Sequence, residues 1–153
     1  MKTPLIIIDM QPFFGSSQKP LGAVLKQIDI AKAAGNPIIL VEYGGCGPSH
    51  PKILDKLVDY KDVICVTKHR DGGEFDIIRE AKTYGIDVSK RVRVVGVNRS
   101  YCVYSTVKGM KNLNQEINGR ELEVEIPTAA TWCTAPKQGR DLLKKLGCTF
   151  VRA

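Results

Sequence analysis

Apolar runs of strand length alternate along the chain with segments whose apolar residues recur at helical spacing. The predicted strands cover 4–9, 37–42, 63–67, 92–97, 122–126 and 148–151. Apolar residues with a helical period lie between them, within 21–31, 75–81, 103–110 and 142–146. The strand runs are almost continuously apolar, which is typical of strands covered on both faces. Gly35, Gly85 and Gly147 stand where helices end in a left-handed residue.

This alternation predicts an α/β fold: a three-layer α/β/α sandwich around a mainly parallel, six-stranded, Rossmann-like sheet of order 3-2-1-4-5-6. The 153 residues, 43% hydrophobic and 25% charged, fit a single globular domain over 1–153 and exclude a disordered or fibrous chain. In such sheets the ligand site lies outside the carboxyl ends of the strands, where the strand order reverses. Candidate chemistry is therefore expected there.

The net charge, the hydropathy and the cysteine content limit the classes of partner and the cellular environment that we expect. Lys plus Arg exceed Asp plus Glu by seven, yet the basic residues are scattered and no run alternates with aromatics, so no nucleic-acid partner is expected. No apolar run approaches the roughly 18 residues of a membrane helix, and the N-terminus lacks the layout of an export signal, so we expect a cytoplasmic protein without membrane contact. The five cysteines include no CxxC pair and are expected to remain thiols.

Three reactive side chains follow predicted strands: Asp9, Lys68 and Cys102. The apolar surroundings of Asp9 raise its proton affinity, and a nearby ammonium lowers it again. Cys102 falls in the first turn of a predicted helix over 102–114, where the helix dipole favours thiolate, so we expect a pKa well below that of free cysteine. Taken singly, these residues are a turn aspartate, a solvated lysine and a core cysteine. The prediction rests on their meeting at one edge of the sheet.

The motifs around these residues resemble one family. Leu-Ile-Ile-Ile-Asp-Met-Gln over 5–11 is followed by Phe14, Val-Thr-Lys over 66–68 by Phe75, and Val-Gly-Val-Asn-Arg-Ser-Tyr-Cys-Val over 95–103 by Thr106. In this order they resemble the isochorismatase-like cysteine hydrolases, which include nicotinamidases and N-carbamoylsarcosine amidohydrolase. The resemblance covers most of the chain.

The resemblance implies a catalytic triad in which Cys102 is the nucleophile, Asp9 is the acid and base, and Lys68 holds both charges in place. It also implies a cis peptide bond between Val97 and Asn98, with the backbone amides of Asn98 and Cys102 facing the oxyanion. Family sites are often completed across subunits, so a homo-oligomer is expected. The predicted function is a hydrolase that needs no cofactor and cleaves a small amide or related carbonyl compound through a Cys thioester.

The chain also departs from the family. Nicotinamidases carry an Asp-x-His metal motif after the second strand, whereas 42–50 lacks it here, and with only His50 and His69 in the chain no metal site is expected. Arg99-Ser100 replaces a common Thr-Asp pair, and 126–130 lacks the usual acidic residue. These departures leave two alternatives open, a vinyl-ether hydrolase acting on an isochorismate-like molecule and a metabolite-binding protein without turnover. A flavodoxin-like or nucleotide-binding module is disfavoured because 10–14 has no phosphate loop.

Six residues are candidates for binding the substrate: Gln11, Phe14, Arg70, Arg99, Tyr101 and Trp132. The two arginines suit a substrate carboxylate by bidentate contact, with solvated arginines as the alternative. The aromatic residues fit either a pocket wall or the core, and Trp132 fits a subunit contact equally well.

Overall fold

The computed structural model describes residues 1–152, and one seven-stranded sheet runs through them. Its strands are β1 (Leu5–Ile8), β2 (Ile38–Tyr43), β3 (Val63–Lys68), β4 (Arg91–Val97), β5 (Glu123–Pro127), β6 (Thr131–Trp132) and β7 (Thr149–Val151). The spatial order is β3-β2-β1-β4-β5-β7, every pair is parallel, and the two-residue β6 pairs with the end of β4. The predicted α/β fold and strand order are confirmed, with the sixth predicted strand as β7 and β6 as an addition.

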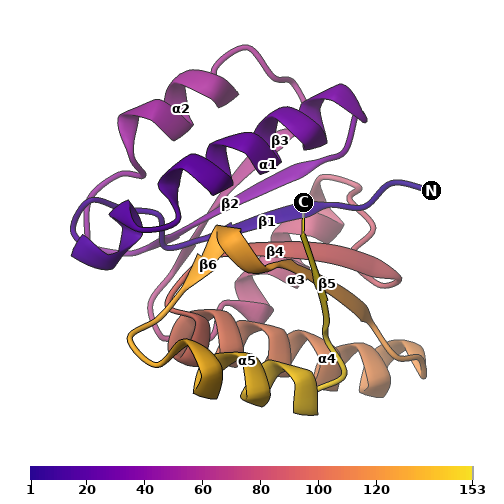
Figure 1. Ribbon diagram of the computed structural model, residues 1–153. Coiled ribbons are helices and arrows are strands. Elements are labelled where there is room, and N and C mark those ends of the chain that lie inside the picture. Colours follow the sequence, from indigo (N-terminus) through magenta and orange to yellow (C-terminus); the bar gives the residue numbers. More distant parts are fainter. Residues whose placement is uncertain (153) are drawn as a thin grey trace.

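Helices cover both faces of the sheet (Figure 1). One layer contains α1 (Leu21–Ala33) and α2 (Pro51–Leu57), and the other contains α3 (Glu74–Thr83), α4 (Tyr104–Asn118) and α5 (Pro136–Lys145). Alternate residues of each central strand enter opposite cores: Ile6 and Ile8 pack against the α3, α4 and α5 layer, and Leu5 and Ile7 against the α1 and α2 layer. This arrangement buries both faces of β1, as its continuous apolar run predicts.

The register of the two central strands brings their ends to one level. Ile8 of β1 pairs with Gly96 of β4, and a Cβ at residue 96 would collide with the carbonyl oxygen of Ile8. Gly96 also has φ of 122°, a conformation that side chains disfavour. Residue 96 therefore has to be glycine for the strands to approach this closely, and Asp9 and Asn98 leave the sheet side by side.

Two local elements differ from the prediction. Helix α2 was not predicted, because its seven residues carry only a short apolar repeat; the available signal was Pro51 at its first turn after His50, whose Nδ1 accepts from the Lys52 amide at 3.1 Å. The predicted helix over 102–114 begins instead as a π-helical turn, η2 (Arg99–Val103), and α4 follows at Tyr104. Cys102 thus lies in a wide turn ahead of the helix.

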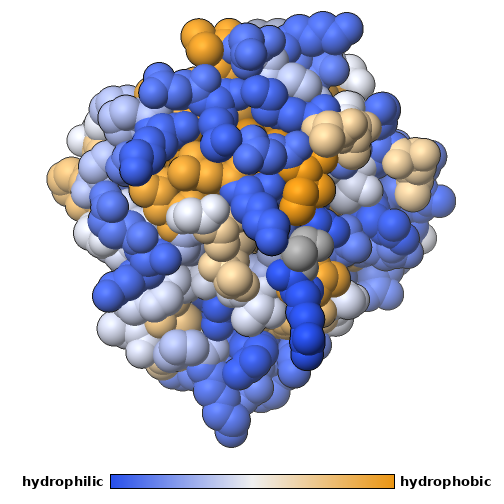
Figure 2. All heavy atoms as spheres, turned by 45° about the horizontal axis from the view of Figure 1, so that its top comes forward, coloured by the Kyte–Doolittle hydropathy of each residue, from blue (hydrophilic) through white to orange (hydrophobic). Residues whose placement is uncertain are grey.

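The surface is mainly hydrophilic where the α1 and α2 layer is turned toward the viewer, with hydrophobic residues gathered in one area near its middle (Figure 2). Two short 3₁₀ turns, η1 (Gly15–Gln18) and η3 (Thr128–Ala130), connect elements. Within residues 1–152, no helix combines the length and the apolar character that crossing a membrane requires.

Candidate active site

Asp9 and Lys68 form a buried ion pair at the carboxyl edge of the sheet. Lys68 is the last residue of β3, and its Nζ lies 3.1 Å from Oδ2 of Asp9. Their side chains are 2% (Asp9) and 0% (Lys68) exposed. Strict strand alternation would point Asp9 toward α1, but the positive φ of 55° at this residue breaks the alternation. The carboxylate therefore meets Lys68 and Cys102, which both belong to the α3 and α4 side.

The Asp9 carboxyl group is buried without being satisfied. Among the described residues, the carboxyl group contacts the Lys68 ammonium at 3.1 Å and the Cys102 thiol, and neither contact has the full geometry of a hydrogen bond. Burial raises the pKa of Asp9, while the Cys102 thiol and the Lys68 ammonium lower it in part. A carboxyl group of this kind is suited to accept and return a proton.

Cys102 reaches the same carboxyl group from η2, and the residue is 8% exposed. Burial, followed by the negative charge of Asp9, raises the pKa of this thiol to about 12. The expectation of a low pKa is therefore wrong. It relied on a helix dipole, but Cys102 precedes α4 and lies in a buried position beside a carboxylate, both of which oppose ionisation. The resting thiol keeps its proton.

The structure adds two residues that the sequence analysis missed. The Cys102 thiol donates to Oδ1 of Asp71 at 3.9 Å, so a second, exposed carboxylate lies on the other side of the sulfur. The ring of Tyr43, at the end of β2, has its centroid 4.1 Å from Nζ of Lys68 and covers the ammonium. Both follow predicted strands near the same edge, and that position was the signal that could have identified them.

The turn after β4 fixes the approach to Cys102. The peptide bond between Val97 and Asn98 is cis. The Asn98 carbonyl accepts from the backbone amides of Tyr101 and Val103, both at 3.1 Å, which closes the wide turn around Cys102. This arrangement places the backbone of Asn98 and Cys102 at one rim of the buried pair.

Two predicted substrate ligands have structural roles instead. Gln11 is fully buried; its side chain donates to the carbonyls of Tyr43 and Gly47 and accepts from the amide of Tyr43, so it holds the loop after β2. Arg99 is 5% exposed, and its guanidinium donates to the Thr131 hydroxyl and to backbone carbonyls in η3, in β6 and at the start of α5. Contacts between distant segments occupy the polar atoms of both side chains, so neither presents a free polar group to a ligand in this structure.

The remaining predicted contact residues surround the site at different depths. Phe14 is partly buried, with its ring centroid 6.2 Å from that of Tyr43. Trp132 pairs with Val97 in the sheet, beside the turn that carries Cys102. Tyr101 is 61% exposed. Arg70 is also exposed, and its guanidinium lies over the ring of Phe75 at 4.8 Å.

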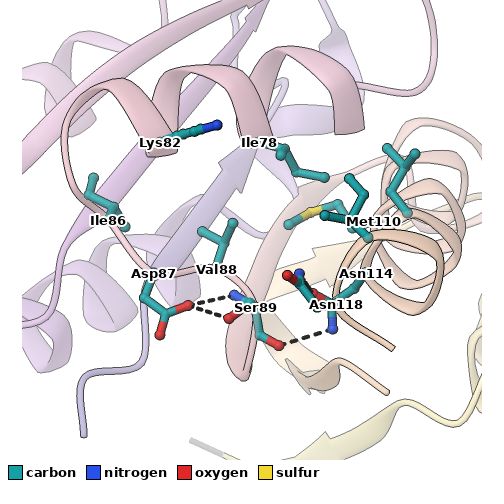
Figure 3. A pocket seen from close by; sticks show the side chains of 11 residues that line it. Ile78, Lys82, Ile86, Asp87, Val88, Ser89, Met110, Asn114 and Asn118 are labelled. Carbon is teal, nitrogen blue, oxygen red and sulfur yellow. Dashed lines mark hydrogen bonds between the residues drawn. The ribbon is translucent and has the colours of Figure 1, made fainter. Parts of the chain in front are cut away.

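A separate hollow of about 310 Å³ lies between the carboxyl-terminal halves of α3 and α4, at the opposite edge of the sheet (Figure 3). Its polar groups bond to one another: Asp87 accepts from Ser89, and Asn114 donates to the Ser89 carbonyl. None of the predicted site residues lines it. Residues 1–152 contain no cluster of three or more His, Cys, Asp or Glu side chains placed to hold a metal ion.

Comparison with known proteins gives a match in structure and none in sequence. No protein-family model and no curated protein matches the chain. The nicotinamidase of Staphylococcus aureus superposes with a TM-score of 0.78 at 16% identity, over 98% of each chain. An isochorismatase-like hydrolase from Alkaliphilus metalliredigens gives 0.72 at 19%, over 99% of this chain and 94% of that one. YcaC from Pseudomonas aeruginosa, in a structure with covalent acrylamide, gives 0.75 at 18%, over 98% and 75%. The chain therefore has the fold of the nicotinamidases and isochorismatase-like hydrolases, as its motifs predict.

Proposed function

We propose that this protein is a cysteine hydrolase that cleaves a small amide or related carbonyl compound through a thioester on Cys102. One observation carries the proposal: a buried carboxyl group, Asp9, contacts both the Lys68 ammonium, at 3.1 Å, and the Cys102 thiol. The fold shared with nicotinamidases and isochorismatase-like hydrolases supports it.

The raised pKa values of Asp9 and Cys102 suit a proton that moves within the pair. Asp9 takes the thiol proton as sulfur attacks the carbonyl carbon, so a free thiolate never has to accumulate. The backbone amides of Asn98 and Cys102 stabilise the oxyanion, each worth about 3 kcal/mol in such sites. Asp9 then gives its proton to the leaving amine and the C–N bond breaks, which leaves the thioester. Water, deprotonated by Asp9, hydrolyses the thioester, and the proton returns to sulfur.

Turnover of a panel of small amides, followed by amine release, tests the assignment. We expect Cys102→Ala to lower the rate by about 10⁴-fold or more and Asp9→Asn by about 10²- to 10⁴-fold. Cys65→Ala, which removes an exposed thiol on β3, is the matched control and should leave the rate unchanged. Mass spectrometry of acid-quenched enzyme should find the acyl group on the peptide that contains Cys102. Full activity of Cys102→Ala would eliminate the mechanism.

Alkylation by iodoacetamide tests the proton coupling without a substrate. Because the charge of Asp9 raises the pKa of the Cys102 thiol, Asp9→Asn should shift the alkylation profile of Cys102 to lower pH. The wild-type profile should still be rising at about pH 10, below the raised pKa of the thiol. Identical profiles for the two proteins would mean that carboxyl and thiol do not interact.

We also propose that the chain forms a homo-oligomer that covers the mouth of the site. Aromatic rings in edge-on and tilted contact lead from Tyr43 through Phe14 to Phe13, which is 69% exposed, and Tyr101, next to Cys102 in the chain, is also exposed. A second copy would bury these rings. Mass photometry at nanomolar to micromolar concentration should find a multiple of the 16.9 kDa chain mass. A fully active monomer would contradict this.

A further inference from the structure

Asp71 lies next to the reacting sulfur but has no part in the proton transfers described above. Its Oδ1 is 3.9 Å from Sγ of Cys102, and the residue is exposed, whereas Asp9 contacts the same thiol from inside the protein. The two carboxylates therefore differ in position: Asp9 is buried and Asp71 is exposed to solvent.

The loop that carries Asp71 is held at both ends. Before it, Nζ of Lys68 donates to the Arg70 carbonyl at 2.9 Å. After it, the amide of Gly73 donates to Oγ1 of Thr106 on α4 at 3.0 Å, and a Cβ at residue 73 would meet the Lys68 side chain at 3.0 Å. The lysine that pairs with Asp9 thus also sets the path of the loop, which fixes the position of Asp71.

No nearby cation among the described residues neutralises Asp71. The Lys68 ammonium is fully buried and paired with Asp9. The Arg99 guanidinium donates to carbonyls and a hydroxyl in η3, in β6 and at the start of α5. The Arg70 guanidinium lies over Phe75. Every ion pair within residues 1–152 involves other carboxylates, so the mouth of the site presents a free negative charge beside Cys102.

We propose that Asp71 determines the charge preference of the site, favouring compounds with a protonated amine or another cationic nitrogen group near the carbonyl and disfavouring carboxylates. The inference rests on the proposed function in so far as Cys102 is the reacting atom. It reverses the expectation that two arginines receive a substrate carboxylate. The substrate class is then a small cationic amide, ureido or amidino compound, with Asp71 accepting its N–H groups.

The charge preference can be measured on the thiol itself, with two reagents of similar size and opposite charge. The rates at which 2-aminoethyl and 2-sulfonatoethyl methanethiosulfonate modify Cys102 are followed by peptide mass spectrometry and divided by their rates with N-acetylcysteine amide. The ratio of the two rates cancels any change in thiol ionisation, because both reagents attack the same sulfur. We expect the wild-type protein to favour the cation by about tenfold, as unit charges a few ångströms apart near a surface allow.

Three variants distinguish the effect of the Asp71 charge from a structural effect of the substitution. Asp71→Asn should reduce the ratio to about one, whereas Asp71→Glu, which keeps the charge, should retain most of it. Asp55→Asn, which removes an exposed carboxylate from α2 in the opposite layer, should leave the ratio unchanged. If Asp71→Asn does not fold, the wild-type ratio at about 20 and 500 mM NaCl decides, because screening should bring it toward one. A wild-type ratio near one at low salt, or the same ratio in Asp71→Asn as in wild type, would overturn the inference.

The measurement does not depend on turnover, so its failure differs from failure of the proposed function. A preserved charge preference without any acyl-enzyme would refute the hydrolase and keep the role of Asp71. An acyl-enzyme without a charge preference would support the hydrolase and refute the role of Asp71. For an active enzyme, kcat/KM for glycinamide relative to succinamate should fall about tenfold in Asp71→Asn.

Discussion

Asp9 and Asp87 lie at opposite edges of the sheet, and their pKa values are shifted in opposite directions. At the edge with the hollow between α3 and α4, Asp87 accepts from the amide and hydroxyl of Ser89 at 2.9 and 2.6 Å. These bonds lower the pKa of Asp87. At the carboxyl edge, Asp9 is buried with both oxygens lacking hydrogen bonds to the described residues, and burial raises its pKa. Both residues follow or precede a strand, and neither sequence position alone separates them.

This difference shows where the fold stabilises itself and where it holds reactive groups. The hydrogen bonds from Ser89 favour the ionised form of Asp87 and contribute to stability when the carboxylate is charged. The Asp9 carboxylate is buried beside one ammonium, and because burial opposes its charged form it is suited to take up a proton. The hollow at the amino edge is therefore a packing feature of two helices, and the carboxyl edge is where chemistry is expected.

We expect the largest loss of stability from a substitution in the buried ion pair of Asp9 and Lys68. Lys68→Met keeps most of the side-chain volume but leaves the Asp9 carboxylate buried without its cation, and we expect a loss of about 3–5 kcal/mol in the free energy of unfolding. Urea unfolding, followed by circular dichroism, measures it. The double variant Asp9→Asn with Lys68→Met should recover most of the loss. A single-variant loss below about 1 kcal/mol would mean that the pair is not buried as described.

Asp9 and Asp87 should contribute to the pH dependence of stability in opposite directions. The pKa of Asp9 is raised on folding, so its contribution is fully present below its unfolded value and is lost as the pH rises through the folded value. The pKa of Asp87 is lowered, so its contribution is present above the unfolded value and is lost as the pH falls.

Unfolding midpoints measured between about pH 3 and 8 test the direction in which each aspartate changes stability with pH. Relative to wild type, Asp9→Asn should become more stable as the pH rises, whereas Asp87→Asn should become less stable. If the stability difference from wild type changed with pH in the same direction for both variants, the contrast between the two edges would be refuted.

A smaller effect is expected at the amino edge. The Asn114 side chain donates to the carbonyls of Ser89 and Arg120, both at 3.0 Å, and it is 5% exposed. Asn114→Ala leaves both carbonyls without this donor, so we expect a loss of about 1–3 kcal/mol in stability with no change in Cys102 reactivity. Changed alkylation of Cys102 in this variant would show that the two edges are coupled.

The smallest effect is expected for an exposed ion pair. Arg91 and Glu123 approach to 2.8 Å, closer than Asp9 and Lys68, but both side chains are well exposed. Because water screens such pairs, Arg91→Gln should leave the urea midpoint unchanged within error. A loss comparable to that of Lys68→Met would mean that distance, rather than burial, decides the strength of these pairs.

The sequence by itself determined the order of the six longer strands, four of the five α-helices and the edge at which reactive residues gather. Continuous apolar runs identify buried parallel strands, and the carboxyl ends of parallel strands meet at one edge. The strand pattern alone was therefore enough to place Asp9, Lys68 and Cys102 together. The motifs around them agree with the fold that the structural comparison found.

Only the tertiary structure decided what each polar group contacts. Gln11 and Arg99 are occupied by segments about 30 or more residues away, the thiol of Cys102 is buried beside a carboxylate, and Asp71 reaches it from another loop. Burial and hydrogen bonding depend on packing between distant parts of the chain, and these two quantities set the pKa values. Local sequence carries no record of them, which is why it suggested a thiolate at Cys102 and a free guanidinium at Arg99, where the structure has a buried thiol and a hydrogen-bonded arginine.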